Sequence, residues 1–435
     1  MPVSLFRRLF LPAPSLAFGL PRELRNASKA LSSYIVAGWN TFPFQENDWK
    51  DAIALALSKG IDGFALDIGR DGWQPGRVAD AYKAAIGTNF KLFLTFDMAS
   101  LPCQTAEDGK ILRQLVTAYA KHSNQLLYDG KPFVSSFGGQ TCKFGTDHMD
   151  EGWSNVLKND LTPVHFVPAF FMEPPIFPSL KSIDGAFSWD SSWPMGNYDI
   201  NSGYDDEYLR YLPGRTYMAG VSPCFFTHYA RDTFDKNFIF RSDGWLPAAR
   251  WELIHKYRNQ IDIVQIISWN DFGESHYIGP IVGAQPMSEA WTTGFDHQDF
   301  LDLMHYYIIG YKTGRFPEIQ NDRIFLWGRL YPAQADAPDS IGKPINFQWT
   351  KDYVWGLIFL TDPAHLELSC GAKSLGVELA SGVNKVNLSL TEDCSVRAVL
   401  TRKSKVVLDF KPPGYNFARF PKNYNFNYFI AASPS

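Results

Sequence analysis

The stretch IDIVQIISWNDFGESHYIGP, residues 261–280, joins an apolar run to a cluster of polar side chains. Its first part, Ile261–Ile267, is rich in β-branched residues and too short for a typical helix, so it predicts a buried strand. The chain then turns polar at Ser268 and carries two acids, Asp271 and Glu274. A buried parallel strand that ends in such a loop is typical of α/β barrels, which place their chemistry there. The alternative is a polar loop with solvated acids.

The chain before this stretch alternates between strand-like and helix-like patterns. The predicted strands are Tyr34–Ala37, Gly63–Leu66, Lys91–Phe96, Phe133–Ser136, His165–Phe170, Gly185–Trp189, Thr216–Gly220 and Ile261–Ile267. Helix-like segments follow most of them, and a last one covers Gln298–Tyr311. This alternation predicts a (β/α)8 TIM barrel over residues 31–315. A doubly wound sheet is the alternative, but no G-x-G-x-x-G motif follows the first strand.

The pattern changes after Gly314, where short strand-like runs alternate with turns and no helical periodicity appears. These runs are Ile324–Trp327, Ile345–Trp349, Val354–Phe359, Leu366–Ser369, Lys385–Leu390, Val396–Leu400 and Lys405–Phe410. They predict a C-terminal β-sandwich accessory domain over residues 322–435. Residues 1–30 are expected to form an N-terminal extension.

The composition of the 435-residue chain narrows the classes of function. The formal net charge is −4 without a long run of one sign, which argues against a nucleic-acid partner. No uncharged apolar span of about 18 residues is present, so no membrane crossing is expected. The aromatic share is 15%, with 13 Trp and 20 Tyr, an excess that suits surfaces that stack on carbohydrate.

The opening residues resemble a signal peptide poorly. Pro12 and Pro14 interrupt the apolar stretch after Arg8, and no clear cleavage site follows. Against this, Asn26 and Asn387 stand in glycosylation sequons. We expect an extracellular or cell-wall protein, with an intracellular one as the alternative.

The five cysteines predict two disulfides. Cys103 and Cys142 each follow the end of a predicted strand, whereas Cys370 and Cys394 flank a hairpin-like segment. We expect these two pairs to be joined and Cys224 to be free. Five reduced thiols in an intracellular protein are the alternative, because an odd and sparse set does not prove oxidation.

Several predicted strands end in acids, which a barrel would bring to one mouth. These acids are Asp67, Asp97, Asp190, Asp271 and Glu274, and tryptophans at strand ends are Trp39, Trp73, Trp189, Trp193 and Trp269. An acidic mouth walled by aromatic rings predicts a cleft for a polysaccharide. Taken singly, each acid also fits a turn, the interpretation that we prefer for Asp62, Asp71 and Asp184, and each tryptophan also fits the core.

Hydrolysis of a glycosidic bond needs one protonated carboxyl and a second group that activates water or attacks carbon. Asp271 and Glu274 supply a candidate pair, and Asn270 and His276 could orient it. A structural hydrogen bond is the alternative for His276. The sequence contains no H-E-x-x-H motif, nucleophile elbow or P-loop, so neither a metal nor a cofactor is predicted.

Six segments resemble glycoside hydrolase family 71, the fungal α-1,3-glucanases or mutanases. They are WNTFPFQENDWKDAIALALSKGIDGFALDIG (39–69), WQPGRVADAY (73–82), KLFLTFDMASLPC (91–103), VPAFF (167–171), FSWDSSWP (187–194) and SWNDFGESHY (268–277). The match runs in order over about residues 33–313. The resemblance implies a (β/α)8 barrel with a β-sandwich and endo-type hydrolysis of α-1,3-glucan with inversion.

The resemblance also implies roles for residues. Asp271 and Glu274 would be the catalytic acids, with Glu274 as general acid and Asp271 as base, in an order that stays open. The substrate-binding residues would be Trp39, Asp67, Trp73, Asp97, Trp189, Asp190, Trp193, Trp269, Asn270, His276 and Tyr277. The expected partner is α-1,3-glucan, bound by a monomer. The alternatives are a glucan-binding protein that has lost turnover and a hydrolase of another glucan linkage.

Overall fold

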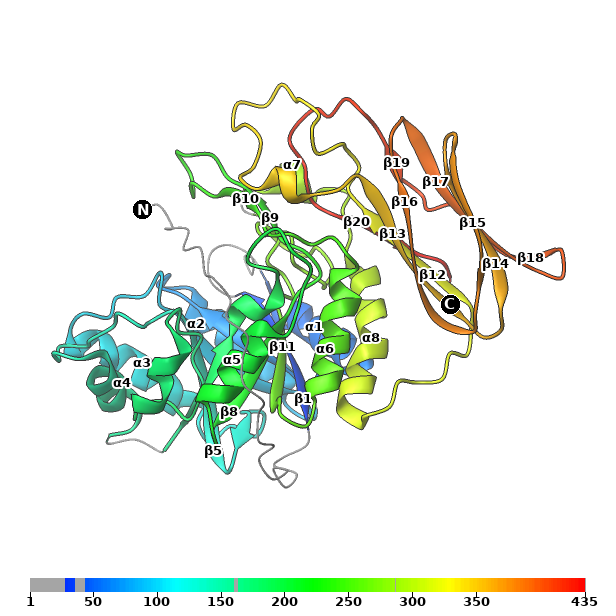
Figure 1. The fold of residues 1–435 in the computed structure, drawn as a ribbon. Coiled ribbons are helices and arrows are strands. Elements are labelled where there is room, and N and C mark those ends of the chain that lie inside the picture. Colours follow the sequence, from blue (N-terminus) through cyan, green and yellow to red (C-terminus); the bar gives the residue numbers. More distant parts are fainter. Residues whose placement is uncertain (1–27, 36–43, 160–162, 286, 435) are drawn as a thin grey trace.

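The computed structural model describes residues 28–35, 44–159, 163–285 and 287–434 (Figure 1). A part built from alternating strands and helices comes first, and antiparallel sheets follow it. The α/β class expected from the sequence is confirmed.

The first part is organised around one large curled sheet. Its parallel strands are β1 (Lys29–Ile35), β2 (Gly63–Ile68), β3 (Lys91–Asp97), β5 (Lys131–Phe137), β6 (His165–Phe166), β7 (Gly185–Ser188), β8 (Thr216–Val221) and β11 (Ile263–Ile266). They pair in the order β6-β5-β3-β2-β1-β11-β8-β7, and the short β4 (Leu127–Tyr128) lies antiparallel on β5. Because all eight run parallel, their carboxyl ends lie at one edge of the sheet.

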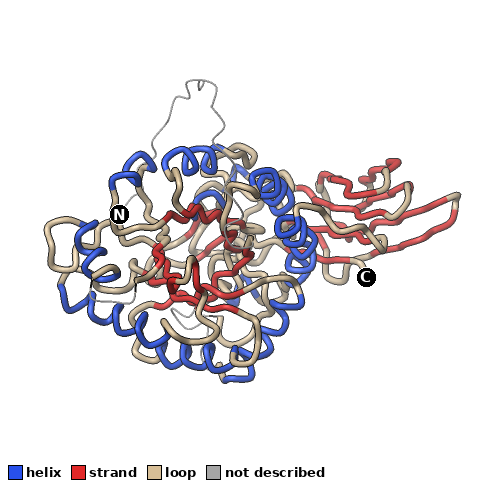
Figure 2. Tube along the Cα trace, turned by 90° about the horizontal axis from the view of Figure 1, so that it is seen from below, coloured by secondary structure: helices blue, strands red, loops and turns tan. Residues whose placement is uncertain are grey.

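Backbone hydrogen bonds also connect the two end strands of this order. The N–H of Asp184 donates to the carbonyl of Phe166 at 2.8 Å, and that of Phe187 donates to the carbonyl of Pro168 at 2.8 Å. Figure 2 shows the strands curled at the centre with helices outside them. The strand predicted over His165–Phe170 is shorter than expected, because after Phe166 the chain makes such single contacts rather than a ladder.

The helices are α1 (Glu46–Ser58), α2 (Gln74–Ala85), α3 (Ala106–Tyr119), α4 (Met149–Leu157), α5 (Gly203–Tyr211), α6 (Leu246–Tyr257), α7 (Glu289–Thr292) and α8 (Gln298–Thr313). Local signals fix some of their ends. Thr105 accepts a hydrogen bond from the N–H of Asp108 and so caps α3. Gly314, at φ 75°, ends α8 in the left-handed conformation that glycine adopts without strain.

Several elements were not expected from the sequence. α5 was not predicted, and the stretch after β8 contains a hairpin of β9 (Phe226–His228) and β10 (Asn237–Ile239) instead of an irregular loop. The hairpin matters for function because it lies at the carboxyl ends of the parallel strands (Figure 1).

The C-terminal part consists of two antiparallel sheets. One contains β16 (Gly382–Ser389), β13 (Tyr353–Leu360), β12 (Arg323–Gly328) and β20 (Phe429–Ala432). The other contains β15 (Lys373–Leu379), β14 (Ala364–Cys370), β17 (Cys394–Arg402) and β18 (Lys405–Phe410), with β19 (Asn416–Phe417) on β17. Alternate residues of β14 are buried, and they share an apolar core with β12 and β13.

The strand predicted over Ile345–Trp349 is wrong. Residues Phe347–Trp349 form a short 3-10 helix, and the Ile345 side chain is 69% exposed. Ile345 hydrogen-bonds only locally to β10, through the N–H of Ile239 and the carbonyl of Asn237. Asn346, at φ 72°, then turns the chain away from the sheet.

Buried polar contacts join the C-terminal sheets to the first part. Trp245 donates from Nε1 to the carbonyls of Gly356 (3.1 Å) and Val386 (3.0 Å). Asp243 binds the Arg329 guanidinium at 3.0 Å and accepts from the Tyr428 hydroxyl at 2.8 Å. The junction is therefore packed and specifically bonded.

The structure joins Cys103 to Cys142 and Cys370 to Cys394 by disulfides, the pairs expected from the sequence. Cys224 is buried and unpaired. No helix in the described ranges is long and apolar enough to cross a membrane.

Candidate active site

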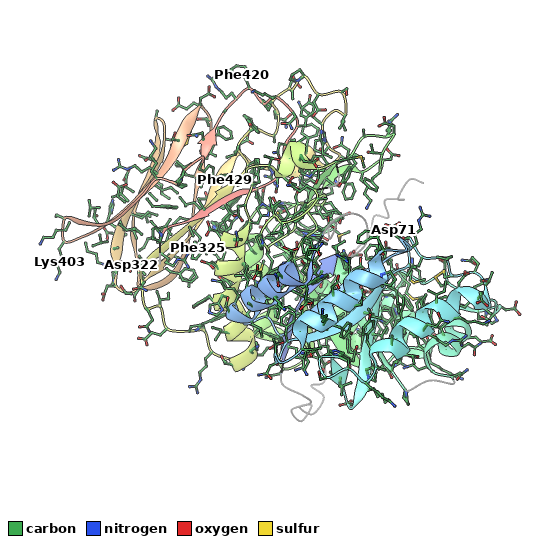
Figure 3. The ribbon with its side chains drawn as sticks, turned by 180° about the vertical axis from the view of Figure 1, so that it is seen from behind. Asp71, Asp322, Phe325, Lys403, Phe420 and Phe429 are labelled. Carbon is green, nitrogen blue, oxygen red and sulfur yellow. A yellow bond between two sulfur atoms is a disulfide. The ribbon has the colours of Figure 1, made fainter. Side chains whose placement is uncertain are left out.

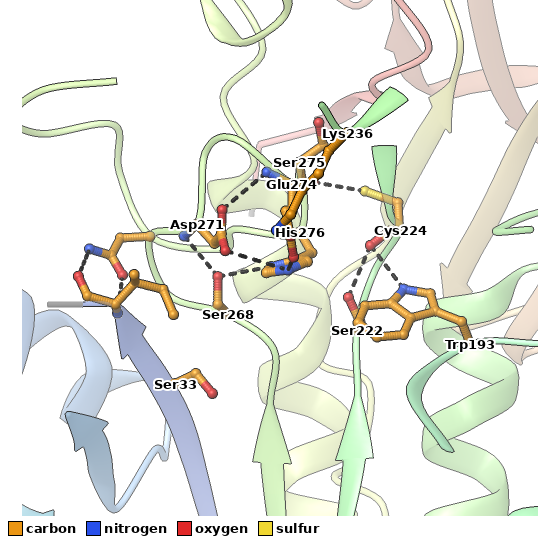
Figure 4. A network of polar contacts seen from close by, with 12 residues as sticks. Ser33, Trp193, Ser222, Cys224, Lys236, Ser268, Asp271, Glu274, Ser275 and His276 are labelled. Carbon is orange, nitrogen blue, oxygen red and sulfur yellow. Dashed lines mark hydrogen bonds and ion pairs between the residues drawn. The ribbon is translucent and has the colours of Figure 1, made fainter. Parts of the chain in front are cut away.

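The loop after β11 is organised by Ser268. Its Oγ accepts a hydrogen bond from the N–H of Asp271 at 2.8 Å and contacts Nδ1 of His276 at 3.0 Å (Figure 4). Its backbone N–H donates to the carbonyl of His276 at 2.8 Å, and its carbonyl accepts from Ile278 at 2.9 Å. These bonds tie the two ends of the loop together, so the segment between them is held in one shape.

This loop is also hydrogen-bonded to β1, the first strand of the sheet. The N–H of Trp269 donates to the carbonyl of Ser33 at 2.7 Å. The Asn270 amide binds both backbone groups of Ile35, accepting from its N–H at 2.7 Å and donating to its carbonyl at 3.0 Å. Asn270 is 2% exposed, and these bonds let it orient the loop.

Asp271 and Glu274 face the same space. The N–H of Glu274 donates to Oδ1 of Asp271 at 3.0 Å, and one carboxylate oxygen of each lies within 4.8 Å of the other. Nε2 of the fully buried His276 lies 3.1 Å from Oε2 of Glu274 and 3.9 Å from Oδ2 of Asp271. The two acidic side chains are 22% and 21% exposed, so both remain accessible.

Lys236 is a further member of the site. It projects from the β9–β10 hairpin, and its Nζ lies 3.0 Å from Oε1 of Glu274. Glu274 therefore sits between a lysine ammonium on one oxygen and an imidazole on the other. No spacing in the sequence singled out this lysine.

The surroundings move the pKa values of the two acids in opposite directions. Burial, followed by the charge of Glu274, raises the pKa of Asp271 to about 6. Burial acts on Glu274 in the same direction, but the Lys236 charge and the His276 hydrogen bond outweigh it and lower the pKa to about 2. Around pH 5 Asp271 is therefore mostly protonated and Glu274 is a carboxylate.

Two more acids reach this cluster from the ends of β2 and β3. Asp67 ends β2, and burial, followed by the charges of Asp97, Asp271 and Glu274, raises its pKa well above the usual range. Its Oδ1 is buried and finds no hydrogen-bond partner among the residues that the structure describes. Asp97 ends β3, where burial raises its pKa and the Lys236 charge partly opposes the shift. The convergence of acids expected from the sequence is present for these four.

The charge of Asp190 acts on groups outside this cluster. Burial raises its pKa to about 6, and the groups that respond to its charge are Tyr198 and Tyr208. Trp189 is partly buried against Phe137, and Trp73, also partly buried, precedes α2. These residues keep some exposed surface near strand ends.

Three residues expected to bind substrate are instead part of the core. Trp193 (0% exposed) donates from Nε1 to the carbonyl of Cys224, and Trp269 (1%) packs on Phe64. Tyr277 (0%) stacks on His297. A ring without free surface cannot stack on a sugar, so the prediction is wrong for these three. Trp39 lies outside the described residues.

Gly273 lets Tyr229 approach the acids. A Cβ on Gly273 would lie 2.1 Å from the Tyr229 hydroxyl oxygen and 3.0 Å from its Cζ. The charges of Asp271 and Glu274, after burial, raise the pKa of this phenol, so it stays protonated and can donate a hydrogen bond. Tyr229 comes from the same hairpin as Lys236, and sequence reasoning missed both.

Asp271, Glu274 and His276 also have donor atoms close enough to hold a metal ion, within 4.8 Å of one another. The Lys236 ammonium, 3.0 Å from Glu274, would repel a cation there. Among the described residues, these donors therefore fit acid–base chemistry better than a metal site.

Comparison with known proteins places this geometry in context. The sequence model described as glycosyl hydrolase family 71 matches residues 27–435. A glucan endo-1,3-alpha-glucosidase of Schizosaccharomyces pombe is 36% identical over 89% of this chain and 91% of its own. A mutanase of Penicillium rubens is 32% identical over 90% of this chain and 86% of its own.

A solved structure supports the fold. The family 99 endo-alpha-mannosidase of Bacteroides thetaiotaomicron superposes with a TM-score of 0.52 at 11% identity and covers 66% of this chain and 97% of its own. At this identity the likeness concerns the α/β fold alone.

Proposed function

The chain belongs to glycosyl hydrolase family 71, and from this premise we propose that it is a glucan endo-1,3-α-glucosidase that hydrolyses α-1,3-glucan. The observation that carries the proposal is the cluster of acids at the mouth of the parallel strands, in which the pKa of Glu274 is lowered and the pKa values of Asp67 and Asp271 are raised. The names of the two relatives supply the linkage.

The proposal includes a complete architecture. The eight parallel strands would form a closed (β/α)8 barrel over residues 31–315, and the antiparallel sheets a β-sandwich over 322–435. The backbone hydrogen bonds of Asp184 and Phe187 support closure, and the apolar core that both C-terminal sheets share supports a sandwich. The extension over residues 1–30 falls almost wholly outside the described residues.

Glu274 has a lower pKa than Asp271, which favours Glu274 as the group that acts on water or carbon. The sequence had led us to expect the reverse, with Glu274 as general acid and Asp271 as base. A carboxylate with a pKa of about 2 stays ionised, as the group that acts on water or carbon must be. The proton donor must be a carboxyl held neutral, and Asp271 and Asp67 both meet that condition.

The separation from Glu274 distinguishes these two donors. Inverting enzymes hold their carboxyls about 6.5–9.5 Å apart, and retaining enzymes about 5–5.5 Å. One carboxylate oxygen of Asp271 lies within 4.8 Å of one of Glu274, which is nearer to the retaining than to the inverting spacing. β2 is two strand spacings from β11, roughly 10 Å at the backbone. We therefore propose inversion with Asp67 as donor and Glu274 as base; retention, with Asp271 as donor and Glu274 as nucleophile, is the second candidate, which the short spacing favours.

The proposed location is extracellular or in the cell wall. Two disulfides are typical of proteins in oxidising compartments. A third relative, 29% identical, is named an ascus wall endo-1,3-alpha-glucanase. We further propose that the protein acts as a monomer.

Product release from insoluble α-1,3-glucan tests the proposal, with α-1,4- and β-1,3-glucans as controls. We expect release from the α-1,3 polymer alone, with the β-anomer appearing first in NMR spectra. The α-anomer first would establish retention. Binding of the polymer without release would point to a glucan-binding protein, and release from another glucan would point to another linkage.

Replacing Lys236 with Met should move the pH profile. The cation lowers the pKa values of both Glu274 and Asp271, so its loss lets both carboxyls hold their protons to higher pH. The rise of kcat/KM with pH follows the deprotonation of Glu274 and should therefore shift from near pH 2 to higher pH. A pH series for Lys236→Met measures this, with Lys236→Arg as the control that keeps the charge. An unmoved acid limb would contradict the role given to Lys236.

Gly273→Ala should lower kcat/KM by about 10–100-fold, because the new methyl group would displace Tyr229 beside the acids. Steady-state kinetics measure the loss, and circular dichroism checks the fold. The double variant Gly273→Ala/Tyr229→Phe lacks the colliding hydroxyl and should regain activity relative to Gly273→Ala. Equal activity in the two variants would mean that this collision is not the cause.

A further inference from the structure

A cavity of about 400 Å³ lies beside the acid cluster, where the first part of the chain meets the C-terminal part. The first part contributes Tyr229 from the hairpin and Trp291 from α7. The C-terminal part contributes Asp339, Ser340, Lys422 and Asn423. The volume falls within the range of about 300–1,000 Å³ that is usual for small-molecule sites.

The walls of this cavity are fixed by hydrogen bonds. Nε2 of His228 lies 2.8 Å from Oδ2 of Asp339, and that oxygen also accepts from the N–H of Tyr424 at 3.0 Å. Asn423 donates from Nδ2 to the carbonyl of Ala290 at 2.8 Å. A ligand would therefore meet a preformed site, which reduces the ordering cost of binding.

The floor is apolar and aromatic. Trp291 is 2% exposed and packs against Tyr229, with ring centroids 5.0 Å apart, and against Phe226. Tyr229 is only partly buried and also contacts Phe234, with ring centroids 4.7 Å apart, so aromatic surface borders the cavity. Such a surface suits the C–H face of a sugar.

Polar groups remain available at the rim. Ser340 and Lys422 are exposed, and within the described part of the chain neither side chain makes a hydrogen bond or an ion pair. Asp339, in contrast, is already occupied by His228 and two backbone N–H groups. A hydroxyl and an ammonium beside an aromatic edge match a neutral ligand rich in hydroxyl groups.

Tyr229 connects this cavity to the reacting centre. Its ring lines the cavity, while its hydroxyl abuts Gly273, between the two acids of the loop. A polymer that is cut at the acids has to continue beyond them, and the cavity begins one side chain away.

We propose that this cavity is a remote subsite that binds a glucosyl unit of the α-1,3-glucan chain, and that the C-terminal part thereby takes part in substrate binding. The inference rests on the proposed function. It assigns a role to Ser340 and Lys422, which lie outside the acid cluster. The subsite would act on chains long enough to reach it and would leave shorter ones unaffected.

A series of α-1,3-gluco-oligosaccharides of increasing length tests this. For the wild type we expect kcat/KM to rise once the chain reaches the subsite. Lys422→Ala should lower that increment by roughly 3- to 10-fold through KM, with kcat and the short substrates unchanged. Ser340→Trp, which fills the cavity with an indole, should remove the increment.

Lys403→Ala is the matched control. Lys403 is an exposed lysine on the turn between β17 and β18, at the outer end of the C-terminal sheets and far from Asp71 near the mouth of the parallel strands (Figure 3). This variant should behave as the wild type at every length. Titration of a long oligosaccharide into Glu274→Gln, with and without Ser340→Trp, gives a readout that is independent of turnover.

The outcomes separate the two proposals. If the wild type cleaves α-1,3-glucan and the Lys422 and Ser340 variants match it at all lengths, the subsite is refuted and the proposed function stands. If the wild type releases nothing from α-1,3-glucan, the proposed function fails and the subsite falls with it. Loss confined to long chains supports both.

Discussion

Glu274→Gln is expected to lower kcat by about 10²–10⁴-fold on α-1,3-glucan, because both stereochemical courses need this carboxylate. The amide keeps the shape of the side chain but cannot accept a proton or attack carbon. Binding of oligosaccharides should change little, since the loss falls on the transition state. Turnover from single time courses and affinity from calorimetry separate the two quantities.

The matched control is Glu378→Gln on β15, whose side chain is 80% exposed and pairs with His365 far from the cleft. It should leave kcat unchanged. Near-normal turnover in Glu274→Gln would remove this residue from the mechanism.

The donor can be identified with the same reasoning. Asp67→Asn and Asp271→Asn should both slow hydrolysis of the polymer, whose leaving group needs a proton. An α-glucosyl fluoride needs none, so the variant that lacks the true donor should recover most of its rate on that substrate. If Asp67→Asn recovers its rate on the fluoride, Asp67 is the donor and we expect inversion. If Asp271→Asn recovers its rate, Asp271 is the donor and we expect retention.

Arg329→Met is expected to destabilise the protein by about 3–5 kcal/mol, the largest effect on stability that we predict. The variant leaves the Asp243 carboxylate buried without its cation, since the two side chains are 3% and 0% exposed. It also removes the stacking of the guanidinium on Tyr428, 4.7 Å from the ring centroid. The midpoint of urea unfolding measures the change.

Arg397→Met, in the exposed pair with Asp409, is the matched control and should hardly move the midpoint. Adding Asp243→Asn to Arg329→Met should recover part of the loss, because the stranded charge is then gone. An unfolding midpoint equal to that of the wild type in Arg329→Met would contradict the account of the junction.

The sequence was most informative about the positions of strands and of the acids that follow them. The apolar run before Ser268 predicted β11, and the strand–helix spacing put Asp67, Asp97 and Asp271 at the carboxyl ends of strands of one sheet. Such placement follows from periodicity and from the rule that parallel strands present the same end. The disulfide pairs were also accessible, because Cys103 and Cys142 each follow a predicted strand and Cys370 and Cys394 flank a hairpin-like segment.

The sequence was least informative about side-chain direction and long loops. Trp193 and Trp269 stand at strand ends but point into the core, and nothing in the local pattern distinguishes that from a platform in the cleft. Lys236 is brought to Glu274 by the pairing of β9 and β10, and β10 is also hydrogen-bonded to Ile345, far along the chain. The pKa order of Asp271 and Glu274 depends on that lysine.

The attachment of the acid loop to the first strand has a consequence for protein synthesis. Asn270 is bonded to Ile35, 235 residues earlier in the chain, and Trp269 is bonded to Ser33. β1 leaves the ribosome long before β11 does. Until β11 has emerged, the edge of β1 that will pair with it stays unpaired. The nascent chain gains an ordered acid pair only when residues 263–276 have emerged and found that edge. Chains that are released early would therefore be inactive and would expose a strand edge to aggregation.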